Sequence, residues 1–241
     1  MKRTALLLFF AALIAIPATA SAQGDEFLLG FTGFDYETDN VGGPDPTPGV
    51  YLQVGDNYEL VGFVTSFGPL LTPWTDFSVE EYTIFMTDLQ VTTRSFFAGF
   101  LSCTFTNDAR VRYYSDLIAG LGGTAGVYGT NPRNATAPST FTDGDGSGTM
   151  QLGGDMDNFI LIYNFNTNQG SWEADVCLDE GFYLTYIPPA QHCGWILGSQ
   201  VGPPNPTIPT GYDNQIQGEC RIPDATPTTH SSWGAVKALY R

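Results

Sequence analysis

The chain has 241 residues, and 25 acidic residues against 9 basic ones give it a formal net charge of −16. This acidity excludes a protein that holds nucleic acid or anionic lipid by electrostatics, because the phosphates would be repelled. Hydrophobic residues make up 42% and charged residues only 14%, while Gly (28) and Pro (16) are abundant. The chain can therefore bury a core, which excludes wholesale disorder.

The N-terminal segment has the three parts of a secretory signal peptide. Lys2 and Arg3 precede an apolar run over residues 5–16, and small residues follow at 18–22. The run is too short to span a bilayer, and the A-x-A pattern predicts cleavage after Ala22. We expect an exported protein of 219 residues (241 − 22) with a charge of −18 (7 − 25), without a transmembrane segment. Its location would be the periplasm, the cell surface or the exterior.

Alternation of apolar and polar residues recurs along the chain and predicts about ten short strands. The segments are residues 27–34, 59–65, 82–87, 95–106, 109–115, 148–152, 159–166, 171–177, 182–187 and 193–197. They are joined by turns rich in Gly, Pro and Asn. We expect a single all-β domain over residues 23–222, either an antiparallel β-sandwich or a partly closed barrel.

Two turns and one ambiguous segment refine this expectation. Asn107-Asp108 is predicted to be a tight hairpin turn, and residues 168–170 (Asn-Gln-Gly) are predicted to be another. Residues 108–118 also carry apolar residues at helical spacing. Arginines alternate there with apolar residues, however, and this alternation favours a strand.

Four cysteines remain after the predicted cleavage: Cys103, Cys177, Cys193 and Cys220. An even number in an exported chain favours two disulfides, for which three connectivities exist. Cys177 and Cys193 bracket a short segment and are the easiest pair to close. A zinc site is the alternative, but the chain has no C-x-x-C spacing to support it.

The C-terminal segment, residues 223–241, is predicted to be a Pro/Thr/Ser linker followed by a short amphipathic helix. From a cap at Ser232, the apolar residues Trp233, Val236 and Tyr240 would share one side, with Lys237 and Arg241 near the C-terminal end of the helix dipole. Such a tag is typical of a docking or sorting element that contacts a cell-surface or sorting partner. The alternative is a frayed end that packs back on the domain.

The tail sequence Trp-Gly-x-Val-Lys-x-Leu-Tyr-Arg over residues 233–241 resembles the ends of many uncharacterised secreted bacterial proteins. Residues 110–154, with Tyr-Gly-Thr-Asn-Pro at 128–132, are also similar to a stretch of such β-rich proteins. The resemblance implies export and an all-β build. It implies no activity, catalytic residue or ligand.

A Gly-rich acidic segment resembles the first half of a calcium loop. Asp143, Asp145 and Ser147 stand at positions 1, 3 and 5, followed by Gly at position 6. Position 12, where a bidentate Glu is usual, is Gly154, so carboxylates from the next strand would have to substitute. The predicted calcium ligands are Asp143, Asp145, Ser147, Thr149, Asp155 and Asp157. The alternative is an acidic hairpin loop without a metal.

Aromatic residues indicate a second function, the binding of a glycan. Trp74 lies in a predicted loop two residues before Asp76. An exposed indole stacks on the C–H face of a sugar, and a nearby carboxylate accepts bonds from its hydroxyls. The alternative for Trp74 is that it fills the core of the β-domain. Trp172 and Trp195 lie on or near predicted strands and are expected to fill that core.

Catalysis has little support in the sequence. Glu173 and Asp175 share one strand face at about the spacing of a retaining carboxylate pair. Carboxylates two residues apart on an acidic strand are more often its solvent face, and His192 has no nucleophile elbow to serve. We therefore expect a non-catalytic structural or adhesive β-domain, with calcium as its candidate stabilising cofactor. A carbohydrate-binding module is the second hypothesis and a secreted hydrolase the third.

Overall fold

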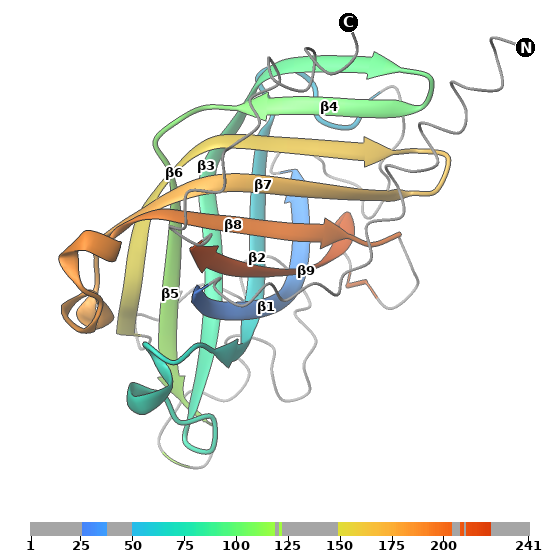
Figure 1. Ribbon diagram of the computed structural model, residues 1–241. Coiled ribbons are helices and arrows are strands. Elements are labelled where there is room, and N and C mark those ends of the chain that lie inside the picture. The colour runs from blue at the N-terminus through green and yellow to red at the C-terminus, as the bar shows by residue number, and fades with distance from the viewer. Residues whose placement is uncertain are drawn as a thin grey trace, which may run out of the picture. The chain divides into compact units, whose positions relative to one another are not determined.

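Nine β-strands and three short 3-10 helices make up the described part of the chain, which contains no α-helix (Figure 1). The computed structural model describes residues 26–37, 50–118, 121, 149–203, 208–209 and 211–222. These residues belong to one compact unit, Glu26–Pro223. The predicted all-β class is confirmed. The predicted signal peptide, linker and helical tag lie outside the described residues.

The strands are β1 (Glu26–Glu37), β2 (Asn57–Phe67), β3 (Glu80–Phe97), β4 (Phe100–Phe105), β5 (Ala109–Leu117), β6 (Thr149–Asn164), β7 (Gln169–Glu180), β8 (Cys193–Val201) and β9 (Asn214–Ile222). The 3-10 helices are η1 (Thr72–Trp74), η3 (Phe182–Tyr186) and η4 (Pro189–Gln191).

Eight of the strands form a closed antiparallel barrel in the order β1-β2-β3-β5-β6-β7-β8-β9. The ring closes because β9 pairs with β1 along nearly the whole length of both strands. Successive strands along the chain are neighbours in the ring, so the barrel is an up-and-down meander. Of the two predicted architectures, the sandwich is wrong, and the barrel is closed rather than partly closed.

The ninth strand, β4, continues the line of β5. Strand β4 pairs with one half of β3 and of β6, and β5 pairs with the other half of each. The predicted strand over residues 95–106 is therefore wrong, because the chain reverses inside it at Ala98 and Gly99, both of positive φ (51° and 87°). The hairpin turn predicted at Asn107-Asp108 is also wrong, because the chain keeps its direction there.

A line of irregular residues bends the sheet where β4 meets β5. Asp88 of β3, Asp108 between β4 and β5, and Asn158 of β6 all have positive φ (65°, 67° and 55°). Asp and Asn tolerate this conformation better than other side chains. The register of β6 against β7 shifts at the same level, between Asp157 and Ile160. This shift is a β-bulge, and it interrupts the alternation of side chains along β6. The interruption explains why residues 148–152 and 159–166 were predicted as two strands, although β6 is one strand that covers most of both segments.

Two further differences concern the end of the chain. Residues 182–187, predicted as a strand, contain the 3-10 helix η3, whereas β9 had not been predicted at all. Among the inward positions of β9, Ile216 is the only fully buried large apolar residue, and Ile222 at the strand's end is partly buried. At Gly218 an added Cβ would lie 2.6 Å from the ring of Phe31. Close packing there requires glycine, and glycine weakens the hydrophobic alternation from which strands are predicted.

Aromatic side chains fill the middle of the barrel. Trp172 of β7 stacks on Phe159 of β6 and Phe31 of β1, with ring centroids 5.0 and 6.1 Å apart. Phe105 lies against Phe159 (4.9 Å) and Tyr58 (5.5 Å), which extends the stack to β2 and β4. All five side chains are buried. An eight-stranded barrel is just wide enough for such filling, so the strands of the barrel enclose a packed core.

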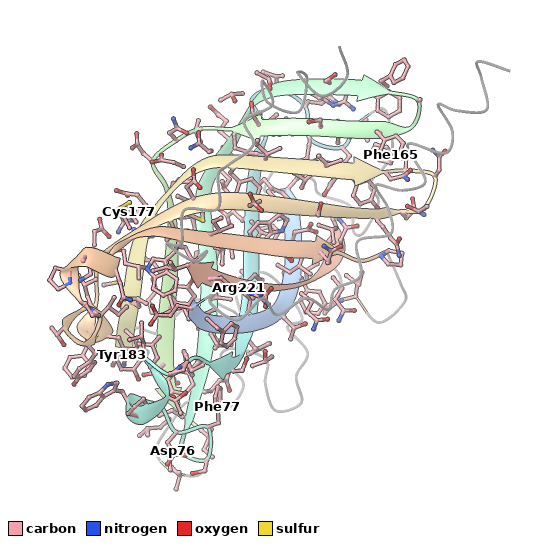
Figure 2. All side chains as sticks on the ribbon, viewed as in Figure 1. Asp76, Phe77, Phe165, Cys177, Tyr183 and Arg221 are labelled. Atoms are coloured by element: carbon pink, nitrogen blue, oxygen red, sulfur yellow. A yellow bond between two sulfur atoms is a disulfide. The ribbon has the colours of Figure 1, made fainter. Side chains whose placement is uncertain are left out.

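The barrel has two ends, which we name after the residues that lie there. The Trp74 end carries the loops 68–79 and 181–192, together with the start of β1 and the end of β9. The Tyr51 end carries residues 50–56 and the hairpins at 98–99 and 165–168. Figure 2 labels Asp76, Phe77 and Tyr183 toward one end and Phe165 toward the other.

A buried carboxylate lies beneath the Tyr51 end. Asp35 of β1 accepts hydrogen bonds from the Tyr58 hydroxyl (2.5 Å) and from the backbone and side-chain nitrogens of Asn214 (2.8 and 3.0 Å). Complete burial, reinforced by the charge of Asp213, raises the pKa of Asp35 to about 7, although the three donors act in the opposite direction. Asp35 is therefore a group that titrates near neutral pH inside the barrel.

The same network holds residues 50–56 against the Tyr51 end. The side chain of Asn214 donates to the Tyr51 hydroxyl (3.1 Å), and the carboxylate of Glu37 accepts a bond from the backbone nitrogen of Leu52. Arg94 donates from Nε to the Tyr51 carbonyl (3.4 Å). Tyr51 and Leu52 are completely buried. This short segment therefore caps one end of the barrel.

One of the two expected disulfides is present. Cys177 of β7 and Cys193 of β8 are bonded and pair directly across the two strands. The expected second disulfide is wrong, because Cys103 and Cys220 are free and buried. Cys103 lies on β4 and Cys220 on β9, which stand on opposite sides of the strand ring, whereas a disulfide requires Cα atoms within about 7 Å.

Candidate functional site

The loop that carries Trp74 is fixed to the barrel at its start. The Thr72 hydroxyl donates to the carbonyl of Gly68 (2.8 Å), and the backbone nitrogen of Trp74 donates to the Leu71 carbonyl (2.9 Å). Leu71 is buried and anchors the turn, while Pro73 suits the first turn of the short helix η1. The indole of Trp74 remains 49% exposed.

A second loop, residues 181–192, meets the first at this end of the barrel. Its anchors are Tyr183 and Ile187, both buried. The Tyr183 hydroxyl donates to the Trp74 carbonyl (3.0 Å), and the ring of Tyr186 lies flat on the Trp74 indole, with centroids 3.9 Å apart and an interplanar angle of 8°. Phe182 meets Tyr186 edge-on (5.5 Å, 82°) and is 58% exposed. The indole is thus held in one orientation by a loop more than 100 residues further along the chain.

Residues 76–82 extend the exposed aromatic surface. Phe77 is 47% exposed and packs on Phe67 and Tyr82, with centroids 5.4 and 5.2 Å away. The Tyr82 hydroxyl accepts a bond from the backbone nitrogen of Asp76 (2.9 Å) and donates to the carboxylate of Glu80. Packing and hydrogen bonds therefore fix the residues that follow Trp74.

We name Trp74, Phe77, Phe182 and Tyr186 the aromatic face. The carboxylate of Asp76 stands beside it in the sequence and accepts bonds from the Ser78 hydroxyl (2.6 Å) and backbone nitrogen (2.8 Å). These bonds, the hydroxyl's above all, lower the pKa of Asp76 below its ordinary value, so the group is charged at neutral pH. Rigid, half-exposed rings beside a carboxylate can stack on a sugar and accept bonds from its hydroxyls.

The structure thus places the two predicted binding residues, Trp74 and Asp76, at one end of the barrel and adds three aromatic residues to them. Phe77 follows Asp76 directly and could have been included from the sequence. Phe182 and Tyr186 could not, because they fell in a segment predicted as a strand. Trp172 and Trp195 are buried in the core as predicted.

The predicted carboxylate pair lies on the outer wall of the barrel. Glu173 and Asp175 are exposed on β7, opposite Gly198 and Ile196 of β8. Asp175 accepts a bond from the side-chain nitrogen of Asn158 (2.7 Å). His192 lies in a different element, with Nε2 3.0 Å from the Ile187 carbonyl oxygen. The described residues do not bring these groups together as one set.

Only part of the predicted calcium site lies among the described residues. Thr149 is exposed at the start of β6, and Asp157 accepts a bond from the backbone nitrogen of Asp108 (3.4 Å). Asp155 is bonded to Arg110. No group of three or more His, Cys, Asp or Glu residues within the described ranges could hold a metal ion. The remaining predicted ligands, Asp143, Asp145 and Ser147, lie outside those ranges, where calcium binding stays a prediction.

An ion-pair network covers the outer wall of β5, β6 and β7. Arg110 contacts Asp155, Asp179 (2.8 Å) and Glu180 (2.5 Å), and Arg112 contacts Glu180 (3.3 Å). The bonds to Asp179, first among these contacts, raise the pKa of Arg110 above its ordinary value. Two of the chain's few bases therefore serve to join neighbouring strands.

The predicted docking residues of the tail, Trp233, Val236, Lys237, Tyr240 and Arg241, lie outside the described residues. Within the described ranges, no helix has the length and apolar character needed to cross a membrane. No protein family model, curated protein or solved structure matches the chain. We therefore infer a function from the geometry of the aromatic face.

Proposed function

We propose that the chain is an exported, non-catalytic, adhesive domain that binds a glycan through the aromatic face. The observation that carries the proposal is the half-exposed indole of Trp74, held flat against Tyr186 and next to the exposed ring of Phe182. Solvent-exposed aromatic residues that are rigidly held bind ligands at a low cost in side-chain entropy.

The rest of the barrel supports a surface site over an internal one. The stacked rings of Phe31, Phe159 and Trp172 occupy the middle of the barrel. A barrel of eight strands holds either such a packed core or one small ligand. The loops at the Trp74 end, by contrast, are fixed by buried anchors while their aromatic tips face solvent, which suits a binding surface on a rigid scaffold.

The disulfide supports the proposed export. The Cys177–Cys193 bond lies close to the strand ends from which loop 181–192 departs. Structural disulfides form and persist mainly in oxidising compartments outside the cytosol. The predicted signal peptide at residues 1–22 is consistent with that location, and the predicted C-terminal tag would then act after export.

Affinity measurements with a glycan array, followed by calorimetry on each hit, test the proposal. We expect Trp74→Ala to weaken binding at least tenfold, which corresponds to the loss of about 1.4 kcal/mol or more. Phe97→Ala is the matched control, because Phe97 is 80% exposed at the opposite end of the barrel, and its removal should leave affinity unchanged. Melting temperatures of both variants separate lost contacts from lost folding.

Two results would contradict the proposal. One is an array on which the protein binds no glycan. The other is a glycan that Trp74→Ala and the wild-type protein bind equally well, since its site would then lie elsewhere.

A further inference from the structure

Carboxylates lie on both sides of the aromatic face. Asp76 belongs to the same loop as Trp74, and Glu80 begins β3 directly after that loop. Glu26 at the start of β1 accepts a bond from the side chain of Gln191 (2.5 Å) in the opposite loop. Glu81 of β3 and Asp116 of β5 stand opposite each other in the strand register near the same end. Carboxylates therefore lie on the loop of Trp74, on the adjoining strands, and, through Glu26, against the loop of residues 181–192.

The arginines of the described part of the chain are all engaged with other groups. The described residues contain four arginines and no lysine. Arg221, at the end of β9, pairs with Glu219 (2.5 Å), and Arg110 and Arg112 pair with carboxylates on the outer wall. Arg94 bonds to the Tyr51 carbonyl at the opposite end of the barrel. Neither loop of the aromatic face, residues 68–79 and 181–192, contains an arginine or a lysine.

Asp76, the carboxylate closest to Trp74 in the sequence, is held in its charged form. Ser78 donates two hydrogen bonds to the Asp76 carboxylate, and both favour its ionised form. An acidic sugar that stacked on the indole would bring a second negative charge toward this one, and no arginine or lysine in the two described loops offsets it. A protonated amine would instead be attracted both by the carboxylates and by the faces of the aromatic rings.

We propose that the aromatic face selects neutral and amino sugars and rejects acidic ones, with Asp76 and Glu80 as the residues that determine this specificity. The inference rests on the proposed glycan-binding function and names the class of glycan. Rejection of the wrong ligand by like charge is a common source of specificity. It also fits a protein whose net charge is −16.

Matched triplets of oligosaccharides test this selectivity. Each triplet shares one backbone in its neutral, amino and carboxyl forms, for example the hexamers of β-1,4-linked glucose, glucosamine and glucuronate, with further triplets on mannose and galactose backbones. At pH 6 and 20 mM salt we expect the carboxyl form to bind at least tenfold more weakly than the neutral form, and the amino form at least as tightly. The difference should shrink at 300 mM salt, because screening shortens the range of the charges.

A double variant, Asp76→Asn with Glu80→Gln, identifies the residues responsible. Both amides keep an oxygen acceptor, for Ser78 and Tyr82 respectively, so the loop should stay folded. We expect the ratio of the neutral form's affinity to the carboxyl form's affinity to fall at least threefold, because the loss of bonds from sugar hydroxyls affects both forms whereas the loss of charge favours only the carboxyl form. The control, Glu173→Gln with Asp175→Asn, removes the same charge from the outer wall and should leave the discrimination intact.

The possible failures are distinguishable. Equal binding of the neutral and carboxyl forms, or discrimination that survives the Asp76/Glu80 variant in full, would overturn the selectivity and leave glycan binding standing. Binding of none of the triplets would overturn both proposals.

Discussion

Replacement of Asp35 by Asn should make the protein more stable at neutral and alkaline pH. Asp35 is completely buried, and its pKa in the folded protein is about 7 against an ordinary value of 3.8. Between these two values the folded protein holds a proton that the unfolded chain has released. Stability therefore falls as the pH rises from about 4 to about 7, and it levels off above that.

The size of the effect follows from the shift. A difference of about 3 pKa units corresponds to roughly 4 kcal/mol, the most that ionisation of Asp35 can cost. Asn keeps an oxygen that can accept the bonds from the Asn214 nitrogens, and its own nitrogen can donate to the Tyr58 hydroxyl. The variant thus preserves the network around Asp35 and carries no charge at any pH.

Urea unfolding at pH 4, 5, 6, 7 and 8 provides the assay. The free energy of unfolding of Asp35→Asn, relative to the wild-type protein, should increase by a few kcal/mol from pH 4 to pH 8. Asp76→Asn is the control, since Asp76 is exposed and its pKa is lowered by the bonds from Ser78, so its removal should not reproduce the rise in relative stability between pH 5 and pH 8. Parallel profiles for Asp35→Asn and the wild-type protein would refute the reasoning, because Asp35 would then not titrate between the folded and unfolded states.

Two further predictions address the cysteines and the core. The protein unfolded in guanidinium without reductant should show two reactive thiols, Cys103 and Cys220, whereas the folded protein should show almost none. Both thiols are buried, and burial raises the pKa of Cys103 to about 12 and raises that of Cys220 as well. A count of zero thiols after unfolding would indicate a second disulfide. Trp172→Ala should lower the free energy of unfolding by about 3–5 kcal/mol in a urea titration, since its ring fills the middle of the barrel. Trp74→Ala should cost less than about 1 kcal/mol in the same titration, and equal costs for the two would contradict the assignment of Trp172 to the core and Trp74 to the surface.

The sequence by itself was sufficient for the features that depend on neighbouring residues. Alternation along β7 places Trp172, Ala174 and Val176 inward, because side chains of a strand point alternately to its two faces. The pairing of Cys177 with Cys193 followed from the short segment between them. Its place in a Pro-containing loop also made Trp74 the candidate for an exposed tryptophan, although burial in the core remained the alternative.

Features that join distant segments were decided only by the tertiary structure. Closure of the barrel depends on pairing between β1 and β9, which lie at opposite ends of the described chain, and the small inward residues of β9 gave no strong hydrophobic pattern. The same holds for the contact between Trp74 and Tyr186, which come from separate loops, and for the separation of Cys103 from Cys220. Local periodicity indicates which face of a strand is buried. The partners of that strand depend instead on the hydrogen-bond register around the whole ring, and this register brings the two loops of the aromatic face together.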